Sequence, residues 1–364
     1  MRLRRRRNEE GHLGKIRWRL LVLLLPLLLL AVPAFGDFAD FFYGWSGAFS
    51  WFADPNSGQS LFPILAIPLG GRYEGMGTAY AAVADEGALL EANPAGSSYL
   101  AGPELSLYHH NWIADGSVEG LAFCTRLGAF GFGIGAKLFY EPFTAYDGSG
   151  ASTAKGYFIE GLLTANVSGN LLPENPYVGL AIGANVKGLL RYVSPELLEN
   201  QSALALPIDV GLLARFRIAG RKARTDKNFS VAVVLRNLGQ KVQPLDYPLP
   251  TTLSVGLAYS PVPALLFALD GNLPISFETS TFAAGQPDLA FGTSVRLTRF
   301  LALHAGMHLV SDNPRFTLGG ALTAGRARVT INYNADLMGG LNPIDLFSAA
   351  VTLDLSKREG VASR

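Results

Sequence analysis

The sequence predicts an all-β protein, a transmembrane antiparallel β-barrel of about 14 strands with an N-terminal, partly helical plug (a hatch). From about Glu104 to Lys357, large apolar residues alternate with small or polar ones, as in TLSVGLAY at 252–259. Successive side chains of a strand point to opposite faces, so each segment has one apolar and one polar face. Soluble sandwiches also alternate, but only 16% of this chain is charged, against roughly a quarter in soluble domains. Hydrocarbon outside and a polar lumen inside account for both observations.

The alternating segments number about fourteen, an even count of the kind that bacterial barrels have. Short breaks separate them, the tightest at Phe300/Leu301 and at Gly325. The predicted strands are 104–112, 117–127, 129–140, 156–169, 177–193, 204–218, 229–238, 251–260, 264–273, 288–300, 301–310, 315–324, 326–336 and 346–356. We therefore assign 103–357 to the barrel and 358–364 to a C-terminal tail.

Composition and motifs argue against several function classes. The net charge is +1, from 30 basic and 29 acidic residues, so no basic field supports nucleic-acid binding. The single cysteine, Cys124, excludes a disulfide framework and a cysteine-based zinc site. His304 and His308 share a strand face about 13 Å apart, too far for one metal ion. There is no G-x-S-x-G motif and no carboxylate pair in a catalytic context. We expect no enzyme, no cofactor and no metal.

Residues 1–36 have the pattern of a cleaved signal peptide. Basic residues including Arg2 and Arg4–Arg7 precede an apolar run from Leu20 to Val32, and small residues precede Asp37. The run is shorter than the roughly 20 residues of a membrane-spanning helix, although an uncleaved anchor is the rival interpretation. This pattern predicts export, and with a barrel it predicts the cell outer membrane.

Residues 37–102 are predicted to be an N-terminal interface segment followed by the plug. The stretch 37–52 is rich in aromatic residues, which fits a membrane interface, the lumen or a packed core. The stretch 62–71 contains too many prolines for a strand. Asp85 is positioned to cap a short helix over 86–92, which Asn93-Pro94 ends. A compact, partly helical stretch of small residues suits a plug better than a barrel wall.

The plug sequence carries a recognisable motif, GRxxGMGxAxxAxADE at 71–86 and NPAG at 93–96. It resembles the hatch of FadL-type long-chain fatty-acid transporters, and most closely the PorV-like branch and an uncharacterised spirochaete (treponemal) family of FadL-like barrels. FPIL at 62–65 and NLG at 237–239 resemble further marks of these branches. The resemblance implies a fourteen-stranded outer-membrane barrel with an internal plug and lateral release of hydrophobic substrates. The plug-motif residues are Gly71, Arg72, Gly75, Met76, Gly77, Asp85, Asn93 and Pro94.

Cationic residues lie on or near the polar faces of the predicted strands. A charge facing mid-bilayer lipid costs about 2–4 kcal/mol, so these side chains are expected to face the lumen. They either bind the carboxylate of an amphipathic molecule or pair with Glu160, Asp209, Asp270 and Asp354. The candidate ligand-binding residues are Lys137, Lys187, Arg191, Arg236 and Arg296.

Two functions stay open at this point. The first is plug-gated uptake of long-chain fatty acids or other hydrophobic molecules, with outer-membrane lipid around the barrel and lateral release. Gly131, Gly133 and Gly135 fit a strand packed on the plug, and with Pro142 they mark the expected kink in the wall. The alternative is a PorV-like role in interaction or secretion, with an exported protein as partner and no solute transport. A structural surface protein is the third possibility.

Overall fold

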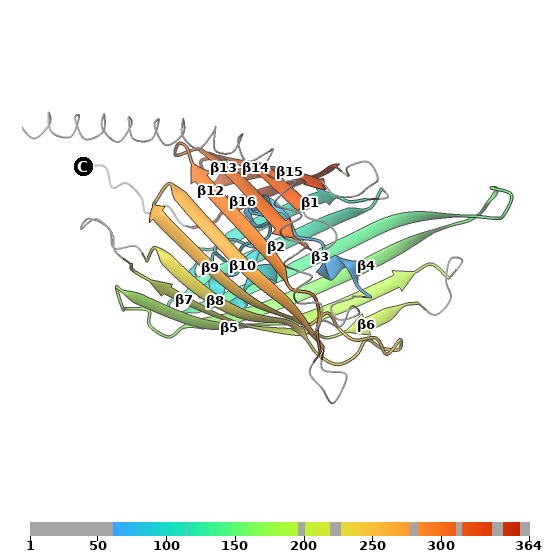
Figure 1. The fold of residues 1–364 in the computed structure, drawn as a ribbon, viewed down its shortest axis with the longest axis horizontal. Helices are drawn as coiled ribbons and strands as arrows, with labels where there is room; N and C mark the ends of the chain where they lie inside the picture. The colour runs from blue at the N-terminus through green and yellow to red at the C-terminus, as the bar shows by residue number, and fades with distance from the viewer. Residues whose placement is uncertain are drawn as a thin grey trace, which may run out of the picture. The chain divides into compact units, whose positions relative to one another are not determined.

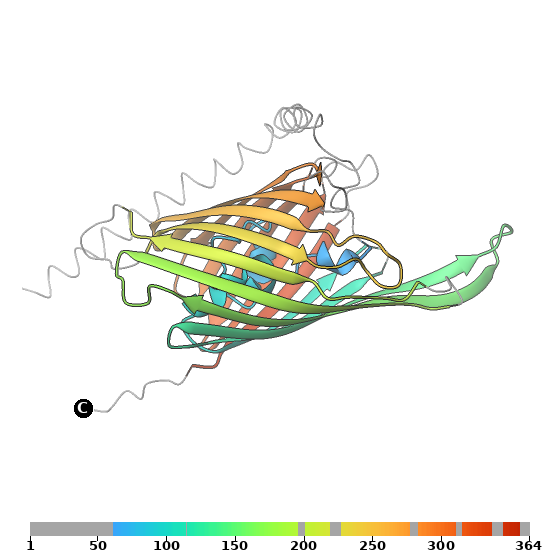
Figure 2. The ribbon, with the colours of Figure 1, turned by 90° about the horizontal axis from the view of Figure 1, so that it is seen from below.

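Fourteen strands within the described residues form a closed antiparallel ring (Figures 1 and 2). A computed structural model describes residues 61–113, 115–195, 201–218, 227–276, 283–310, 315–336 and 345–356. Each strand pairs with its neighbour, and β1 (Glu104–Asn111) closes the ring on β16 (Asp345–Asp354), from Glu104↔Asp354 to His110↔Ser348. The predicted barrel and its strand number are confirmed.

Two short strands lie outside the ring, β6 (Ala203–Ala205) and β11 (Ala283–Ala284). The remaining strands are β2 (Ser117–Leu127), β3 (Phe130–Tyr146), β4 (Ser152–Asn170), β5 (Val178–Val193), β7 (Ile208–Phe216), β8 (Phe229–Leu238), β9 (Thr252–Val262), β10 (Leu265–Ser276), β12 (Asp288–Arg296), β13 (Leu301–Leu309), β14 (Arg315–Ala324) and β15 (Ala327–Asp336).

Two predicted strands, 129–140 and 156–169, are longer in the structure as β3 and β4, and two others are divided or shorter. The predicted strand 204–218 is divided into β6 and β7, because Pro207 lies between them and has no N–H for a ladder. The predicted strand 288–300 ends at Arg296, where a turn begins in which Thr298 Oγ1 accepts hydrogen bonds from the backbone N–H groups of Phe300 and Leu301.

The wall alternates in the manner expected of a membrane barrel. In β4, Leu163 is 64% exposed on the outer face, whereas Glu160 on the inner face is fully buried. Other strands carry large apolar side chains outward in the same way, for example Ile134, Leu190 and Ile331. An apolar outer surface with a polar interior is stable only where hydrocarbon meets the outside.

The ends of the barrel differ. The short-turn end, where β1 begins and β16 ends, includes the two-residue connections 128–129, 263–264 and 325–326. The opposite, long-loop end includes the connection 239–251 between β8 and β9. At the long-loop end, β3 and β4 continue as a hairpin beyond the rest of the wall, which Figure 2 shows in green.

The position of Pro142 in this hairpin changes the prediction that Pro142 marks a kink in the barrel wall. β3 pairs with β2 only as far as Tyr140, so Pro142 lies on an unpaired edge of the projecting hairpin, where proline removes no ladder bond. The pairing of β3 with both neighbours runs without a register shift through Gly131, Gly133 and Gly135.

The plug fills the barrel from residue 61 to β1 (Figures 1 and 2, blue). It contains η2 (Pro63–Leu65), α3 (Gly71–Gly75), α4 (Leu89–Ala92) and η3 (Pro94–Tyr99). No helix in the described ranges combines the length and apolarity needed to cross a membrane. The predicted helix 86–92 is shorter than expected, and Asp85 does not cap it, because its carboxylate binds Arg72 instead.

Glycines let the plug touch the wall directly. A methyl group at Gly306 of β13 would overlap the backbone nitrogen of Gly77, and Gly77 itself has a φ of 61°. A methyl group at Gly131 of β3 would overlap the backbone of Ser97 and Ser98, which confirms that the glycine-rich strand packs on the plug. The predicted signal peptide (1–36), the aromatic stretch 37–52 and the tail 358–364 lie outside the described residues.

Candidate functional site

A cavity of about 580 Å³ lies between the plug and the wall, toward the long-loop end. Its volume falls within the roughly 300–1,000 Å³ of small-molecule pockets. Apolar side chains from the plug and the wall line one part of it, including Leu65, Ile67, Trp112, Leu162 and Leu346. Charged and polar side chains line the rest, so the cavity suits a molecule with both an apolar and a polar part.

Two of the five candidate cations line this cavity, Lys187 and Arg236. Lys187 Nζ is 2.7 Å from Asp209 Oδ2 and donates to Asn237 Oδ1 at 3.0 Å, so its charge is largely compensated. Arg236 instead donates from Nη2 to Asn272 Oδ1 at 2.8 Å and to Ser254 Oγ. Within the described ranges Arg236 forms no ion pair, which makes it the stronger candidate for an anionic ligand group.

A β-bulge aims Asn237 into this site. The register between β7 and β8 shifts between Ile208 and Val210, and Asn237 adopts a φ of 57°. Its backbone N–H donates to Asp209 Oδ1 at 2.8 Å, while its side chain meets Lys187. The NLG stretch that resembled a family mark is therefore the point where a bulge re-aims a polar side chain inward.

Lys137 and Arg191 hold the plug rather than line the cavity. Lys137 Nζ donates to the backbone carbonyls of Ile64, at 3.0 Å, and Ile67, and it lies 2.6 Å from Glu91 Oε1. Arg191 Nη1 donates to the Leu61 carbonyl at 2.8 Å, and its guanidinium stacks 4.5 Å from the centre of the Phe158 ring. Both cations thus bind backbone oxygens of the entry segment, defined here as residues 61–69.

Carboxylate side chains also bind backbone N–H groups of the entry segment. The Ile64 N–H donates to Glu160 Oε2 at 2.9 Å, and the Leu69 N–H donates to Glu91 Oε2 at 2.9 Å. Its apolar side chains Phe62, Ile64 and Ile67 are buried in a cluster with residues of β2 to β6 and of the connection 239–251. The segment therefore covers an apolar strip of inner wall with cations at its edge.

Arg296, the fifth candidate, lies apart from the others. It is the last residue of β12, exposed at the short-turn end, whereas Asp288 at the start of β12 lines the cavity. Eight residues of strand separate the two positions, roughly 27 Å.

The plug motif forms a clasp near the short-turn end. Arg72 pairs with Asp85 through Nη2 and lies 3.3 Å from Glu86 through Nε, while Arg328 Nη1 of β15 lies 2.7 Å from Glu86. The Tyr80 hydroxyl donates to Asp85 Oδ1 at 2.7 Å. Burial opposes ionisation of Asp85, but the adjacent Arg72 guanidinium outweighs it and holds the pKa of the carboxyl below its usual range.

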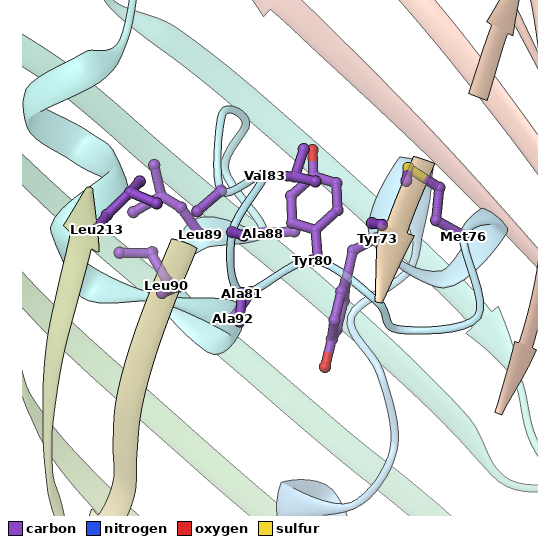
Figure 3. Close-up of a cluster of buried hydrophobic side chains, with 14 of the residues drawn as sticks. Tyr73, Met76, Tyr80, Ala81, Val83, Ala88, Leu89, Leu90, Ala92 and Leu213 are labelled. Carbon is purple, nitrogen blue, oxygen red and sulfur yellow. The ribbon is translucent and has the colours of Figure 1, made fainter. Parts of the chain in front are cut away.

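The other motif residues shape the plug and its contact with the wall. Gly71 and Gly75 bound α3, and the fully buried Met76 packs against Gly292 of β12. Asn93 accepts the Ala95 N–H at 3.0 Å at the start of η3, where Pro94 is the first residue. Figure 3 shows Leu89 and Leu90 of the plug beside Leu213 of β7, within one buried cluster.

The alternative prediction, that the lumen cations pair with four carboxylates of the barrel, agrees with the structure in part. Asp209 pairs with Lys187, but Asp270 accepts the backbone N–H groups of Tyr80 and Ala81 at 2.7 and 2.8 Å. Asp354 accepts from Ser356 at the barrel end. The interior carboxylates therefore hold plug backbone as well as cations.

The candidate ligand-binding residues did not include the acidic and imidazole side of the cavity, and His308 was considered only as a metal ligand. Asp288 and His308 line the cavity and lie 2.9 Å apart, and Glu74 Oε1 lies 3.3 Å from His110 Nε2. The alternation along β12 could have predicted that Asp288 faces the lumen. Its partners come from other strands, so the alternation could not have predicted them. Within the described ranges no group of three or more metal-ligating side chains is present.

Comparison with known protein families shows to which family this chain belongs. The family described as "Uncharacterised protein family (UPF0164)" matches residues 50–357, most of the chain. The chain belongs to this UPF0164 family. A UPF0164 protein of Treponema pallidum (strain Nichols) is 31% identical over 223 residues, 58% of this chain. A second one is 28% identical over 187 residues, 49% of this chain. The chain spans about half the length of the first relative (51%) and 35% of the second. The expected treponemal relationship is confirmed.

Solved structures share the fold of this UPF0164 chain at low sequence identity. The Ralstonia pickettii toluene transporter TbuX has a TM-score of 0.52 at 13% identity, covering 78% of this chain and 97% of its own. A Pseudomonas aeruginosa FadL homologue has a TM-score of 0.53 at 10% identity, covering 78% and 98%. The Pseudomonas putida toluene transporter TodX has a TM-score of 0.51 at 14% identity, covering 78% and 96%. This chain therefore has the FadL-like outer-membrane barrel fold, shared with two proteins named as toluene transporters and with a FadL homologue.

Proposed function

We propose that this protein is an outer-membrane transporter for amphipathic small molecules, with long-chain fatty acids as one ligand class. The cavity between plug and wall carries this proposal, because it combines an apolar lining with Arg236, a cation without an ionic partner within the described ranges. Barrels of this type have short turns on the periplasmic side and long loops outside. By that rule the cavity faces the exterior, where a ligand would first arrive.

The entry segment is the part of the plug that we propose to move. Its contacts to Lys137, Arg191 and Glu160 are side-chain contacts to backbone groups, which an amphipathic ligand can replace with its own polar and apolar atoms. Withdrawal of Phe62 and Ile64 would extend the cavity along the strip of inner wall that they cover. Ligand binding and plug rearrangement are then linked, because both compete for one surface.

Lateral release is the last step of this proposal. The strand pairing of β3 is continuous, so an exit requires the plug to leave the wall first. Ser97, Ser98 and Leu90 are the plug residues that press on Gly131, Gly133 and Gly135. Retraction of these residues would leave the glycines without packing on the lumen side, and we propose the exit there.

Uptake of radiolabelled palmitate into proteoliposomes tests the proposal. We expect uptake above that of empty liposomes, and a loss of about tenfold in affinity for Arg236→Gln because a charge-assisted contact is removed. Arg296→Gln is the matched control, since it removes the same charge far from the cavity. The absence of palmitate binding and uptake by the wild-type protein would refute fatty acids as a ligand class, and failure to bind any of the amphipathic molecules tested would refute the transporter proposal.

A second candidate function is docking of an exported protein, and the β3–β4 hairpin favours it. Beyond Tyr140 and before Tyr157 the two strands pair only with each other within the described residues. Phe143 and Tyr146 are 43% and 65% exposed there. Replacing 143–155 with a two-residue turn should abolish co-purification of an exported partner while leaving palmitate uptake intact.

A further inference from the structure

The cavity wall carries a row of side chains in which one amide joins a cation to a carboxylate. Arg236 Nη2 donates to Asn272 Oδ1 at 2.8 Å, and Asn272 Nδ2 donates to Asp288 Oδ1 at 2.6 Å. His308 Nε2 lies 2.9 Å from the same carboxylate oxygen. These residues come from β8, β10, β12 and β13, and all four line the cavity. Register explains the row, because Asn272 is the cross-strand partner of Asp288.

Within the described residues Arg236 has no carboxylate partner, and Asp288 is contacted by an amide and an imidazole rather than by a lysine or an arginine. Arg236 has an amide and a hydroxyl as its hydrogen-bond acceptors. Asp288 is bound by the Asn272 amide and by His308, both at Oδ1, and within the described residues Oδ2 accepts no hydrogen bond. The side chains of Asp288 and His308 are 20% and 23% exposed, so they are accessible from the cavity. The row presents a cation and a carboxylate one amide apart.

The other charged residues of the lining are compensated differently. Lys187 pairs with Asp209 at 2.7 Å, and Glu91 pairs with Lys137 at 2.6 Å. Glu74 accepts hydrogen bonds from Asn334 and Ser348, and its Oε1 lies 3.3 Å from His110 Nε2. Arg315 stacks 5.6 Å from the centre of the Trp112 ring. Arg236 and Asp288 are therefore the pair that a ligand would meet along this wall.

Charge matching then selects among ligand classes. A pure hydrocarbon would desolvate both groups without replacing their lost water contacts. A simple carboxylate at Arg236 would bring its own negative charge close to Asp288, which is unfavourable. A headgroup carrying both an anion and an ammonium satisfies both sites at once. We infer that the cavity recognises amphiphiles with a zwitterionic headgroup, the anion on Arg236 and the ammonium on Asp288.

This inference rests on the proposed transport function and narrows its substrate class. The apolar tail would lie against Leu65, Ile67 and Leu162, on the same lining that the transport proposal uses. A lysophospholipid with an ethanolamine headgroup has the required chemistry, with a phosphate and an ammonium separated by two carbons. Lysophosphatidylglycerol is the matched probe, because it keeps the phosphate and the tail but replaces the ammonium by hydroxyls.

The experiment measures equilibrium binding of radiolabelled lysophosphatidylethanolamine, lysophosphatidylglycerol and palmitate to the full chain in nanodiscs, with empty nanodiscs subtracted. We expect the ethanolamine lipid to bind at least about tenfold more tightly than the glycerol lipid, the gain of one charge-assisted contact. Asp288→Asn should abolish this difference, and Arg236→Gln should weaken both lysolipids. Arg296→Gln should change neither.

The outcomes separate the inference from the transport proposal. Equal affinity of the wild-type protein for the two lysolipids, with palmitate bound, overturns the zwitterion assignment and leaves transport intact. Binding of none of the three probes overturns both. Because the lysolipid ratio is measured on the wild-type protein, the inference can fail even if a variant does not fold. Cold-versus-heated electrophoresis establishes which variants form the barrel.

Discussion

The Nζ atom of Lys137 lies 2.6 Å from Glu91 Oε1, so an ion pair joins strand β3 to the plug helix α4. The side chain of Lys137 is 3% exposed and that of Glu91 is 17% exposed. The same lysine binds two carbonyls of the entry segment, Ile64 and Ile67. One side chain of the wall thus anchors two separate parts of the plug.

Lys137→Met should therefore loosen the plug without opening the barrel. Removing one partner of a buried pair costs about 3–5 kcal/mol, because the other charge is left uncompensated. We expect higher single-channel conductance in planar bilayers and a lower temperature for loss of heat-modifiable migration. Lys137→Met/Glu91→Gln should cost less than the two single changes together, since they share one interaction. Unchanged conductance in the lysine variant would show that this anchor does not hold the plug.

Gly306→Ala should prevent the plug from docking on β13. The added methyl group would overlap the Gly77 backbone nitrogen, and overpacking of this kind costs about 1–3 kcal/mol. Limited proteolysis of the 61–103 stretch should become faster. Gly188→Ala is the matched control, because nothing lies within 4 Å of a methyl group there. Equal protection of the plug in both variants would contradict the assigned contact.

The sequence pattern predicted the barrel well because each strand has to present apolar side chains to lipid on one face. Ser117–Leu127, Phe229–Leu238 and Arg315–Ala324 match their predicted bounds, since apolar alternation and turn residues end together there. The division at Pro207 was missed because alternation continues across it, although a proline inside a predicted strand was a visible warning.

The candidate site was less predictable, because strand phase gives the side on which a charge lies but not its partner. Lys137 and Lys187 both face the lumen, yet one binds plug carbonyls and the other pairs with Asp209. Such partners lie far away in sequence, and barrel register and plug position bring them together. The row from Arg236 to Asp288 depends on three strands at one height, which no local pattern contains.

Acid should weaken the Arg72–Asp85 clasp. The pKa of Asp85 is lowered in the folded protein, so its contribution to stability is complete above the unfolded value of 3.8. As the pH falls below that value, the unfolded state takes up the proton first and stability is lost until the folded pKa is passed. We expect faster proteolysis of the plug below about pH 4. In Arg72→Gln the acid dependence should shrink, because the cation that lowers the pKa is gone. An identical pH profile in that variant would exclude the clasp as its origin.

Two substitutions of Asn237, the residue at the β-bulge, distinguish the contribution of its backbone conformation from that of its side chain. Its φ of 57° is a conformation that glycine adopts freely, whereas a β-branched residue there is strained. Asn237→Gly should keep the bulge and lose only the side-chain hydrogen bonds, from Lys187 Nζ and to the Pro250 carbonyl, at a cost of about 1–2 kcal/mol. Asn237→Val should lose the contact and add strain of about 1–3 kcal/mol. Urea titration of the heat-modifiable form compares the two variants. If glycine proves as destabilising as valine, the backbone conformation is not what this position requires, and the side-chain hydrogen bonds to Lys187 and Pro250 account for the whole effect.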